Sequence, residues 1–196
     1  MRFQTAPNLD IIAPGLINEP WNEAQVLGSA VWLWMHSKAH RDLPLHTLPT
    51  VLLPAIKNRQ FVLGSEAGKP VFYMAWANFS AEAEQRYASR HPLLMPEADW
   101  NSGDRFWILT LIAPFGHMPV AYKLLREQLF ASWCGRFLYH RGNERGLNIK
   151  TFYGKAVSRE ELCEWRLTHP VAPLSVAAPL NSALLPLPST QAGERT

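Results

Sequence analysis

The sequence predicts a single α+β domain, and three observations lead to this prediction. Hydrophobic residues make up 47% of the chain and charged residues 18%, which supplies enough apolar surface for a core. Segments of helical periodicity alternate with segments rich in β-formers. The length of 196 residues suits one domain with extensions. We expect that domain over residues 22–169, between an irregular arm at 1–21 and a Pro-rich, disordered tail at 170–196.

Two helical segments are expected at the start of the domain. The side chain of Asn22 can cap a helix, and apolar residues at helical spacing follow it. This helix should fade near residues 37–40. A second, short helical stretch is expected over residues 48–58, where Pro54 limits the helix because proline cannot donate a backbone hydrogen bond.

A β-hairpin is expected next. Residues 60–64 (QFVLG) and 70–77 (PVFYMAWA) are rich in β-formers and flank a polar turn at 65–69. Ser80 then precedes a stretch with acidic residues in its first turn. Such a pattern predicts a capped helix that runs to about Ser89.

The rest of the domain is expected to alternate between strands and helices. Residues 105–112 (RFWILTLI) are so apolar that we expect a central strand, buried on both faces. A helix over residues 119–130 should begin with its proline. Late strands are expected at 137–140 and 148–153, and a last helix at 160–166.

Positive charge gathers in one part of the chain. Residues 123–159 contain eight Lys or Arg, opposed only by Glu127 and Glu144. Such a segment favours an anionic partner, which could be nucleic acid, anionic lipid or an acidic protein. A solvated basic surface without a partner is an equal alternative. No nucleic-acid-binding motif accompanies the charge, so a function in nucleic-acid binding is not expected.

Several other classes of protein are disfavoured by patterns that the sequence lacks. No apolar run is long enough for a membrane-spanning helix, and the first residues do not resemble a secretory signal. Cys134 and Cys163 lie far apart and form no CxxC pair, so we expect a reducing, cytoplasmic environment. Phosphate-loop, dinucleotide-binding and nucleophile-elbow motifs are also missing.

Two of the seven histidines stand at a spacing that could matter for chemistry. His36 and His40 are four residues apart and would share a face of a continuous helix. The intervening H-S-K-A-H sequence offers neither a catalytic Glu nor an obvious third ligand, so no metal is expected. His40 could act in proton transfer, or could simply be favoured by the end of a helix dipole.

Five blocks, in the correct order, resemble the RTX toxin-activating lysine acyltransferases, which include the haemolysin- and cyclolysin-activating proteins. The blocks are AVWLWMHSKAHRDLP (30–44), LPAI (53–56), PVFYMAWANFS (70–80), DWNSGDRFW (99–107) and IAPFG (112–116). The resemblance covers roughly residues 28–123. It weakens beyond about residue 130.

The resemblance implies a fold and an activity. Members look like variants of the GCN5-type N-acyltransferase fold, with a mixed sheet flanked by helices. They take a fatty acyl chain from the phosphopantetheine thioester of acyl-acyl-carrier protein and place it on an internal lysine of an RTX protoxin. The expected partners are therefore acyl-carrier protein and protoxin. The resemblance further implies action in the cytoplasm, no permanently bound cofactor, and a homodimer as one expected state of assembly.

The resemblance also assigns residues to the reaction. A lysine amine has an ordinary pKa of about 10.4, so a base must remove its proton before it can attack. The family's catalytic His falls on His40, and Ser37, the motif serine of the same block, is predicted to bind substrate. The family's catalytic Asp aligns with Thr110, whose hydroxyl supplies no charge.

This departure at Thr110 leaves three interpretations. The enzyme could work with a weaker His–Thr pair. A nearby group, such as Asp104, Asp99 or His117, could take the place of the missing acid. Alternatively, the protein could be a weakened relative that binds carrier protein or toxin without efficient transfer.

Further residues are predicted to bind substrate. Arg105 could meet the phosphate of the carrier's arm, or Asp104 and Arg105 could instead form a structural turn with a buried ion pair. By analogy with the fold family, Asn78 and the strand of Thr110 would wall the groove for the thioester arm. Arg41 and the basic segment could dock an acidic carrier through complementary charge.

Overall fold

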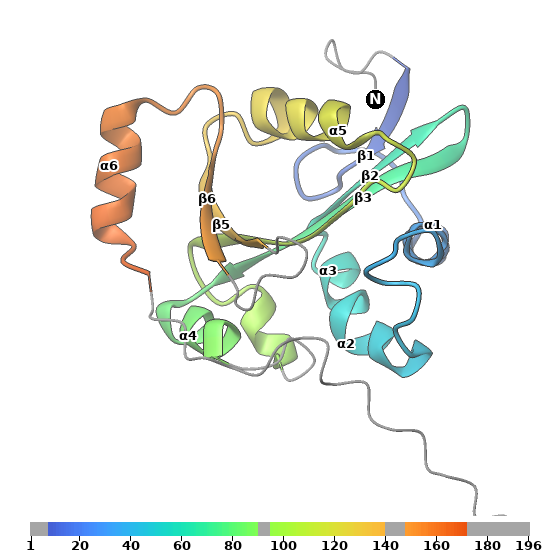
Figure 1. The fold of residues 1–196 in the computed structure, drawn as a ribbon, viewed down its shortest axis with the longest axis horizontal. Helices are drawn as coiled ribbons and strands as arrows, with labels where there is room; N and C mark the ends of the chain where they lie inside the picture. The colour runs from blue at the N-terminus through green and yellow to red at the C-terminus, as the bar shows by residue number, and fades with distance from the viewer. Residues whose placement is uncertain (1–7, 90–94, 140–147, 172–196) are drawn as a thin grey trace, which may run out of the picture.

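The computed structural model describes residues 8–89, 95–139 and 148–171, which form one mixed sheet with helices on both faces (Figure 1). The strands are β1 (Leu9–Ile12), β2 (Phe61–Glu66), β3 (Lys69–Phe79), β4 (Arg105–Ile112), β5 (Cys134–Tyr139) and β6 (Asn148–Tyr153). The helices are α1 (Glu23–Met35), α2 (Leu48–Val51), α3 (Leu53–Lys57), α4 (Ala81–Ser89), α5 (Met118–Leu124) and α6 (Arg159–Thr168). The predicted tail lies outside the described residues from residue 172 onwards.

The order of strands in the sheet follows the order of the chain, β1-β2-β3-β4-β5-β6. Every neighbouring pair is antiparallel except β4 and β5, which are parallel. The α+β class and the mixed sheet predicted from the sequence are therefore confirmed. None of the helices in the described residues has the length and apolar character needed to cross a bilayer.

The predicted helix starts are confirmed by their caps. The Asn22 side chain accepts a hydrogen bond of 3.0 Å from the Gln25 backbone N–H at the start of α1. The Ser80 hydroxyl accepts one of 3.1 Å from the Ala83 N–H at the start of α4. Each cap satisfies a backbone donor that has no partner within its helix.

Two expectations about the first third of the chain are corrected. The arm predicted to be irregular contains β1, in which Leu9 and Ile11 are buried and the backbone pairs with β2. The single helical stretch over residues 48–58 is two short helices that meet at Leu52. Pro54 accounts for the break, because it lies in the first turn of α3 and has no N–H to continue the preceding helix.

Each face of the sheet packs against its own set of helices. Helices α1, α3 and α4 cover one face through a cluster that includes Leu33, Trp34 and Tyr73. Helix α5 covers the other face (Figure 1). It packs there in a cluster that includes Phe72 of β3 and Phe130. We call these the α1 face and the α5 face.

The central strand β4 separates from β5 halfway along its length. The parallel ladder consists of the pairs Trp107–Arg136 and Ile108–Phe137, although both strands continue beyond it. At the same point Leu109 is an extra residue opposite β3, which makes a β-bulge. Ile108–Leu111 are only half-buried, so the expectation that this strand is buried on both faces is corrected. We call this divergence the β4–β5 fork.

Candidate active site

His40 lies in a tight turn just beyond α1. The helix ends at Met35, and the His36 backbone N–H bonds back to the Leu33 carbonyl. The Ser37 carbonyl then accepts hydrogen bonds from the N–H groups of His40 (3.0 Å) and Arg41 (2.9 Å). These bonds fix the backbone of His40 relative to α1. The ring position is therefore set by the end of a helix that packs on the sheet through one buried side.

The His40 ring has one hydrogen-bond partner and one aromatic neighbour. Its Nδ1 lies 2.9 Å from the Ser37 hydroxyl oxygen, and its ring centroid lies 5.2 Å from that of Trp34. Ser37 is the only hydrogen-bond partner of the ring among the described residues. In the tautomer that carries its proton on Nδ1, the ring donates to Ser37 and leaves a free lone pair on Nε2. The ring is half-buried, so packing does not seal it from solvent.

Burial determines the protonation state of His40. It lowers the pKa of the ring from its ordinary 6.5 to about 4, because the imidazolium form loses its hydration. No carboxylate of the described residues bonds to the ring to offset this effect. His40 is therefore a neutral imidazole at neutral pH, able to accept a proton.

Thr110 lies on the same side of the sheet as Trp34, whose ring packs against His40. It is half-buried on β4, just past the end of the β4–β5 ladder. Its partner on β3 is Ala75, which packs in the same cluster as Trp34. Directly opposed strand residues project to one face, so Thr110 points to the α1 face. No hydrogen bond joins the Thr110 and His40 side chains, and a direct His–Thr pair stays a prediction.

The three groups considered as substitutes for the missing acid all have other partners. Each has a polar contact elsewhere: Asp99 forms an ion pair with Arg86 at 2.6 Å, Asp104 lies 3.5 Å from a ring nitrogen of His169, and His117 lies 3.3 Å from Glu66. None of the three bonds to the His40 ring. The orientation of that ring therefore depends on Ser37.

Two predicted binding residues occupy different settings. The Arg41 side chain is 58% exposed beside His40, and its guanidinium lies 3.6 Å from Asp42, so it is accessible to an anionic partner. Asn78 is the second-last residue of β3, and its carbonyl accepts hydrogen bonds from the N–H groups of Ser102 and Gly103. Asn78 therefore holds the loop that leads into β4. Its role as a wall of the donor groove stays a prediction.

Arg105 takes part in a buried ion pair, as the structural alternative expects. Its side chain is 12% exposed, and its guanidinium lies 2.6 Å from a Glu84 carboxylate oxygen. A second bond of 3.2 Å goes to the Pro170 carbonyl. A phosphate would have to compete with both acceptors. Asp104 is exposed and lies beside His169.

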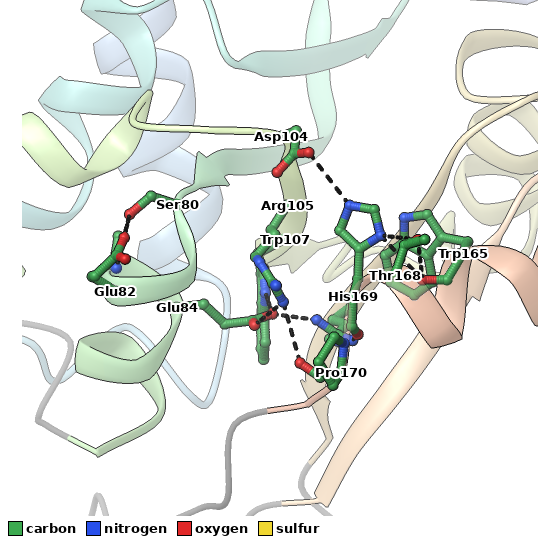
Figure 2. A network of polar contacts seen from close by, with 12 residues as sticks. Ser80, Glu82, Glu84, Asp104, Arg105, Trp107, Trp165, Thr168, His169 and Pro170 are labelled. Carbon is green, nitrogen blue, oxygen red and sulfur yellow. Dashed lines mark hydrogen bonds and ion pairs between the residues drawn. The ribbon is translucent and has the colours of Figure 1, made fainter.

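The cluster around Glu84 was not expected from the sequence. This residue was expected to serve only the first turn of α4, yet it is 2% exposed and contacts side chains of β4 and β5 (Figure 2). Arg136, counted with the basic segment, is one of those contacts and is itself buried. An arginine within an apolar strand is the signal that could have indicated a buried acidic partner.

His36 and His40 do not come together as a metal site. The Nδ1 of His36 lies 2.8 Å from the Trp32 carbonyl, and its ring packs against Phe115. Across residues 8–89, 95–139 and 148–171, no group of three or more His, Cys, Asp or Glu side chains has the arrangement of a metal site. His36 therefore has Trp32 and Phe115 as partners, whereas the His40 ring bonds to Ser37.

Comparison with known proteins agrees with the resemblance. Residues 19–153 match the RTX toxin acyltransferase family. The leukotoxin-activating lysine-acyltransferase LtxC of Aggregatibacter actinomycetemcomitans is 37% identical over 139 residues, which cover 71% of this chain and 82% of LtxC. The protein-lysine myristoyltransferase RtxC of Kingella kingae is 37% identical over 131 residues, 67% of this chain and 77% of RtxC. The protein-lysine myristoyltransferase HlyC of Escherichia coli is 41% identical over 112 residues, 57% of this chain and 62% of HlyC. The chain therefore belongs to the RTX toxin acyltransferase family.

Proposed function

We propose that this protein is a protein-lysine acyltransferase that moves a fatty acyl chain from acyl-carrier protein to an internal lysine of an RTX protoxin. Family membership supports the class of reaction. The observation that carries the assignment of residues is the half-buried, neutral His40 ring, held by Ser37 through Nδ1. That arrangement leaves Nε2 for the incoming amine.

The proposed reaction needs one base and no covalent intermediate. The lysine reacts as its neutral amine, after the ammonium form has lost a proton to solvent. As the amine nitrogen attacks the thioester carbonyl carbon, His40 Nε2 accepts one of the two protons that remain on that nitrogen. The tetrahedral intermediate then collapses, the C–S bond breaks, and the imidazolium returns its proton to the departing thiolate. The products are the amide on the lysine and the free thiol of the carrier's arm.

The cysteines of the chain give little support to an acyl-enzyme. Burial raises the pKa of the Cys134 thiol, and the nearby Glu161 carboxylate raises it further. Less thiolate forms at neutral pH as a result, and the thiolate is the nucleophilic species. Cys163 is exposed on α6, a helix without buried residues. Direct transfer in a ternary complex is therefore the mechanism we propose.

The β4–β5 fork is the proposed site of the donor's arm. Beyond Ile108 and Phe137 the backbone groups that face the gap lack each other as partners. The phosphopantetheine arm carries amides that could bond to such groups as an extra strand would. The GCN5-type fold is also expected to have such a fork, so the arm is placed here by analogy with that fold. Thr110 lies beside the fork, on the face that also carries His40.

An acidic carrier protein could dock on the basic side chains between α5 and β6. The Lys155 backbone N–H bonds to the Arg126 carbonyl at 2.9 Å, which brings the two ends of the basic segment together. Lys123 and Lys150 are exposed, whereas Arg136 is buried and does not contribute to this surface. The homodimer and the cytoplasmic site of action stay predictions.

A transfer assay tests the proposed function. The protein is incubated with acyl-carrier protein and a protoxin fragment, and a mass shift on a lysine is measured. We expect His40→Ala to reduce transfer by about a hundredfold or more, as loss of a general base does. His36→Ala is the matched control, because that histidine is exposed nearby and bonds to the Trp32 carbonyl rather than to the His40 ring. Equal transfer by wild type and His40→Ala would refute the role of His40.

Thr110 favours one alternative function. Without a charged partner for the imidazolium, the protein could hold carrier protein or toxin with little turnover. Binding of acyl-carrier protein to the wild type, without lysine modification over hours, would support this alternative.

A further inference from the structure

The Glu84 carboxylate joins three elements of the fold. Glu84 lies on α4, yet its side chain is buried beneath the sheet. Its Oε2 accepts a hydrogen bond of 2.6 Å from Arg105 of β4. Its Oε1 accepts one of 2.7 Å from the Trp107 indole N–H, also on β4, and one from the Arg136 guanidinium on β5. Figure 2 shows Glu84 facing Arg105 and Trp107.

The Glu84 carboxylate accepts hydrogen bonds from β4 and β5 at a position where the two strands are still paired. Trp107 and Arg136, which share Oε1, are direct partners in the parallel ladder. The ladder ends one residue later, at Ile108 and Phe137. Glu84 therefore links the two strands at the closed end of the β4–β5 fork.

Arg136, which forms the link on β5, is held in place as well. Arg136 is 2% exposed, and its other nitrogen donates to the His169 carbonyl. Its guanidinium lies 4.8 Å from the centre of the Trp165 ring, which in turn stacks on His169. Arg136 therefore has little freedom to move away from Glu84.

Stability alone does not explain such a cluster. Buried ion pairs cost desolvation, and apolar side chains of similar size often stabilise a core as well or better. A charge-assisted cluster does fix geometry, because each group has few positions in which all its partners are satisfied. In this protein the Glu84 cluster fixes the position of β4 relative to β5.

We propose that Glu84 is a positioning residue that sets the opening of the β4–β5 fork and thereby the fit of the acyl donor's arm. This inference rests on the proposed function in one respect, namely that the arm of acyl-carrier protein enters the fork. Glu84 itself does not contact His40 and takes no part in the proton transfer.

Three variants test the proposal. Glu84→Gln keeps the shape of the side chain but removes its charge. Trp107→Phe removes the indole donor and part of the buried ring but leaves the charge of Glu84, and it serves as the milder change. Arg86→Gln is the matched control, because it breaks another ion pair of α4, to Asp99, which lies outside both strands.

Hydrogen exchange measures the strand link independently of activity. In Glu84→Gln we expect amides of 107–112 and 136–139 to exchange about tenfold faster or more, with a smaller increase in Trp107→Phe and none in Arg86→Gln. Unchanged exchange in a folded Glu84→Gln protein would overturn the proposal. If Glu84→Gln does not fold, unchanged exchange of the same amides in Trp107→Phe would overturn the proposal.

Transfer kinetics measure the consequence for the donor. We expect KM for acyl-carrier protein to rise about tenfold in Glu84→Gln, while the pH profile of kcat and the KM for the protoxin fragment stay as in the wild type. A merely structural defect would lower the active fraction and leave KM unchanged, and that result would contradict the proposal. A wild type without transfer would refute the proposed function, whereas the exchange data would still decide whether Glu84 links the strands.

Discussion

A histidine with a pKa of about 4 is a weak base for a lysine amine, and the cause lies in its surroundings. Trp34 and the turn after α1 remove water from the His40 ring, while Ser37 supplies orientation without charge. In hydrolase triads a carboxylate stabilises the imidazolium that forms. We predict that Thr110 occupies the position of the family's carboxylate, as the sequence blocks imply. We therefore expect the missing negative charge at residue 110 to limit the rate of acyl transfer.

Thr110→Asp should restore the missing charge. The side chain at this position points to the α1 face, so a carboxylate there should raise the pKa of His40 from about 4 towards 6.5 and speed transfer about tenfold or more. Titration of the His40 ring by NMR and kcat measure the two effects. Thr110→Asn, similar in size but neutral, should produce neither. A raised pKa without faster transfer would show that the base is not limiting.

The same pKa predicts how stability depends on pH. Below about 6.5 the unfolded chain binds a proton at residue 40, whereas the folded ring stays neutral until about pH 4. Stability is therefore fully present above pH 6.5 and falls as the pH drops, by at most about 3 kcal/mol from this group. Urea unfolding of wild type and His40→Gln between pH 7 and pH 4 measures it. The variant should lose less stability over this range, and parallel curves would contradict the prediction.

At the scale of elements, local signals predicted most of the fold and contacts between distant residues account for the misses. The caps at Asn22 and Ser80 and the β-rich hairpin are encoded within a few residues, and all were found. Strand β1 has four residues and depends on pairing with β2, about fifty positions away. The partners of Glu84 on β4 and β5 are 21 and 52 residues distant, which no local pattern reveals.

The same distinction applies to the candidate site. Ser37 and His40 are three residues apart in one motif, and their hydrogen bond could be expected from it. The half-burial of Thr110 depends on where β5 leaves β4, which is a property of the whole sheet. The sequence could therefore single out His40 as the predicted base and Ser37 as its neighbour, but it could not show how deeply the ring is buried or how open its surroundings are.

The start of α1 offers a test at this scale. Asn22→Ala removes the cap bond to Gln25 and should lower the free energy of unfolding by about 1 kcal/mol. Because α1 ends next to Ser37 and packs through buried residues, we expect the helix to persist and transfer to stay within about twofold of wild type. Thermal unfolding and the transfer assay measure the two quantities. A large loss of transfer in a folded variant would mean that the cap also controls the His40 turn.

At the scale of the whole molecule, the basic side chains proposed to bind the carrier and the turn that carries His40 lie on different faces of the sheet. Lys150 projects from β6 to the α5 face, because it pairs with Phe137, which packs in the cluster on that face. Lys123 lies on the helix that covers this face. His40 and Thr110 belong to the α1 face. The carrier body and its thioester would thus contact different sides of the sheet, with the β4–β5 fork between them.

Reversing two of these charges tests the arrangement. Lys123→Glu with Lys150→Glu should raise KM for acyl-carrier protein about tenfold and leave kcat nearly unchanged, because the body of the carrier is repelled while the chemistry around His40 is untouched. In the wild type the same KM should rise with ionic strength, since exposed charges are screened within about 8 Å at physiological salt. Lys69→Glu, at the exposed hairpin tip where β3 begins, is the matched control and should match wild type. An unchanged KM in the double variant, or one insensitive to salt, would place the carrier elsewhere on the molecule.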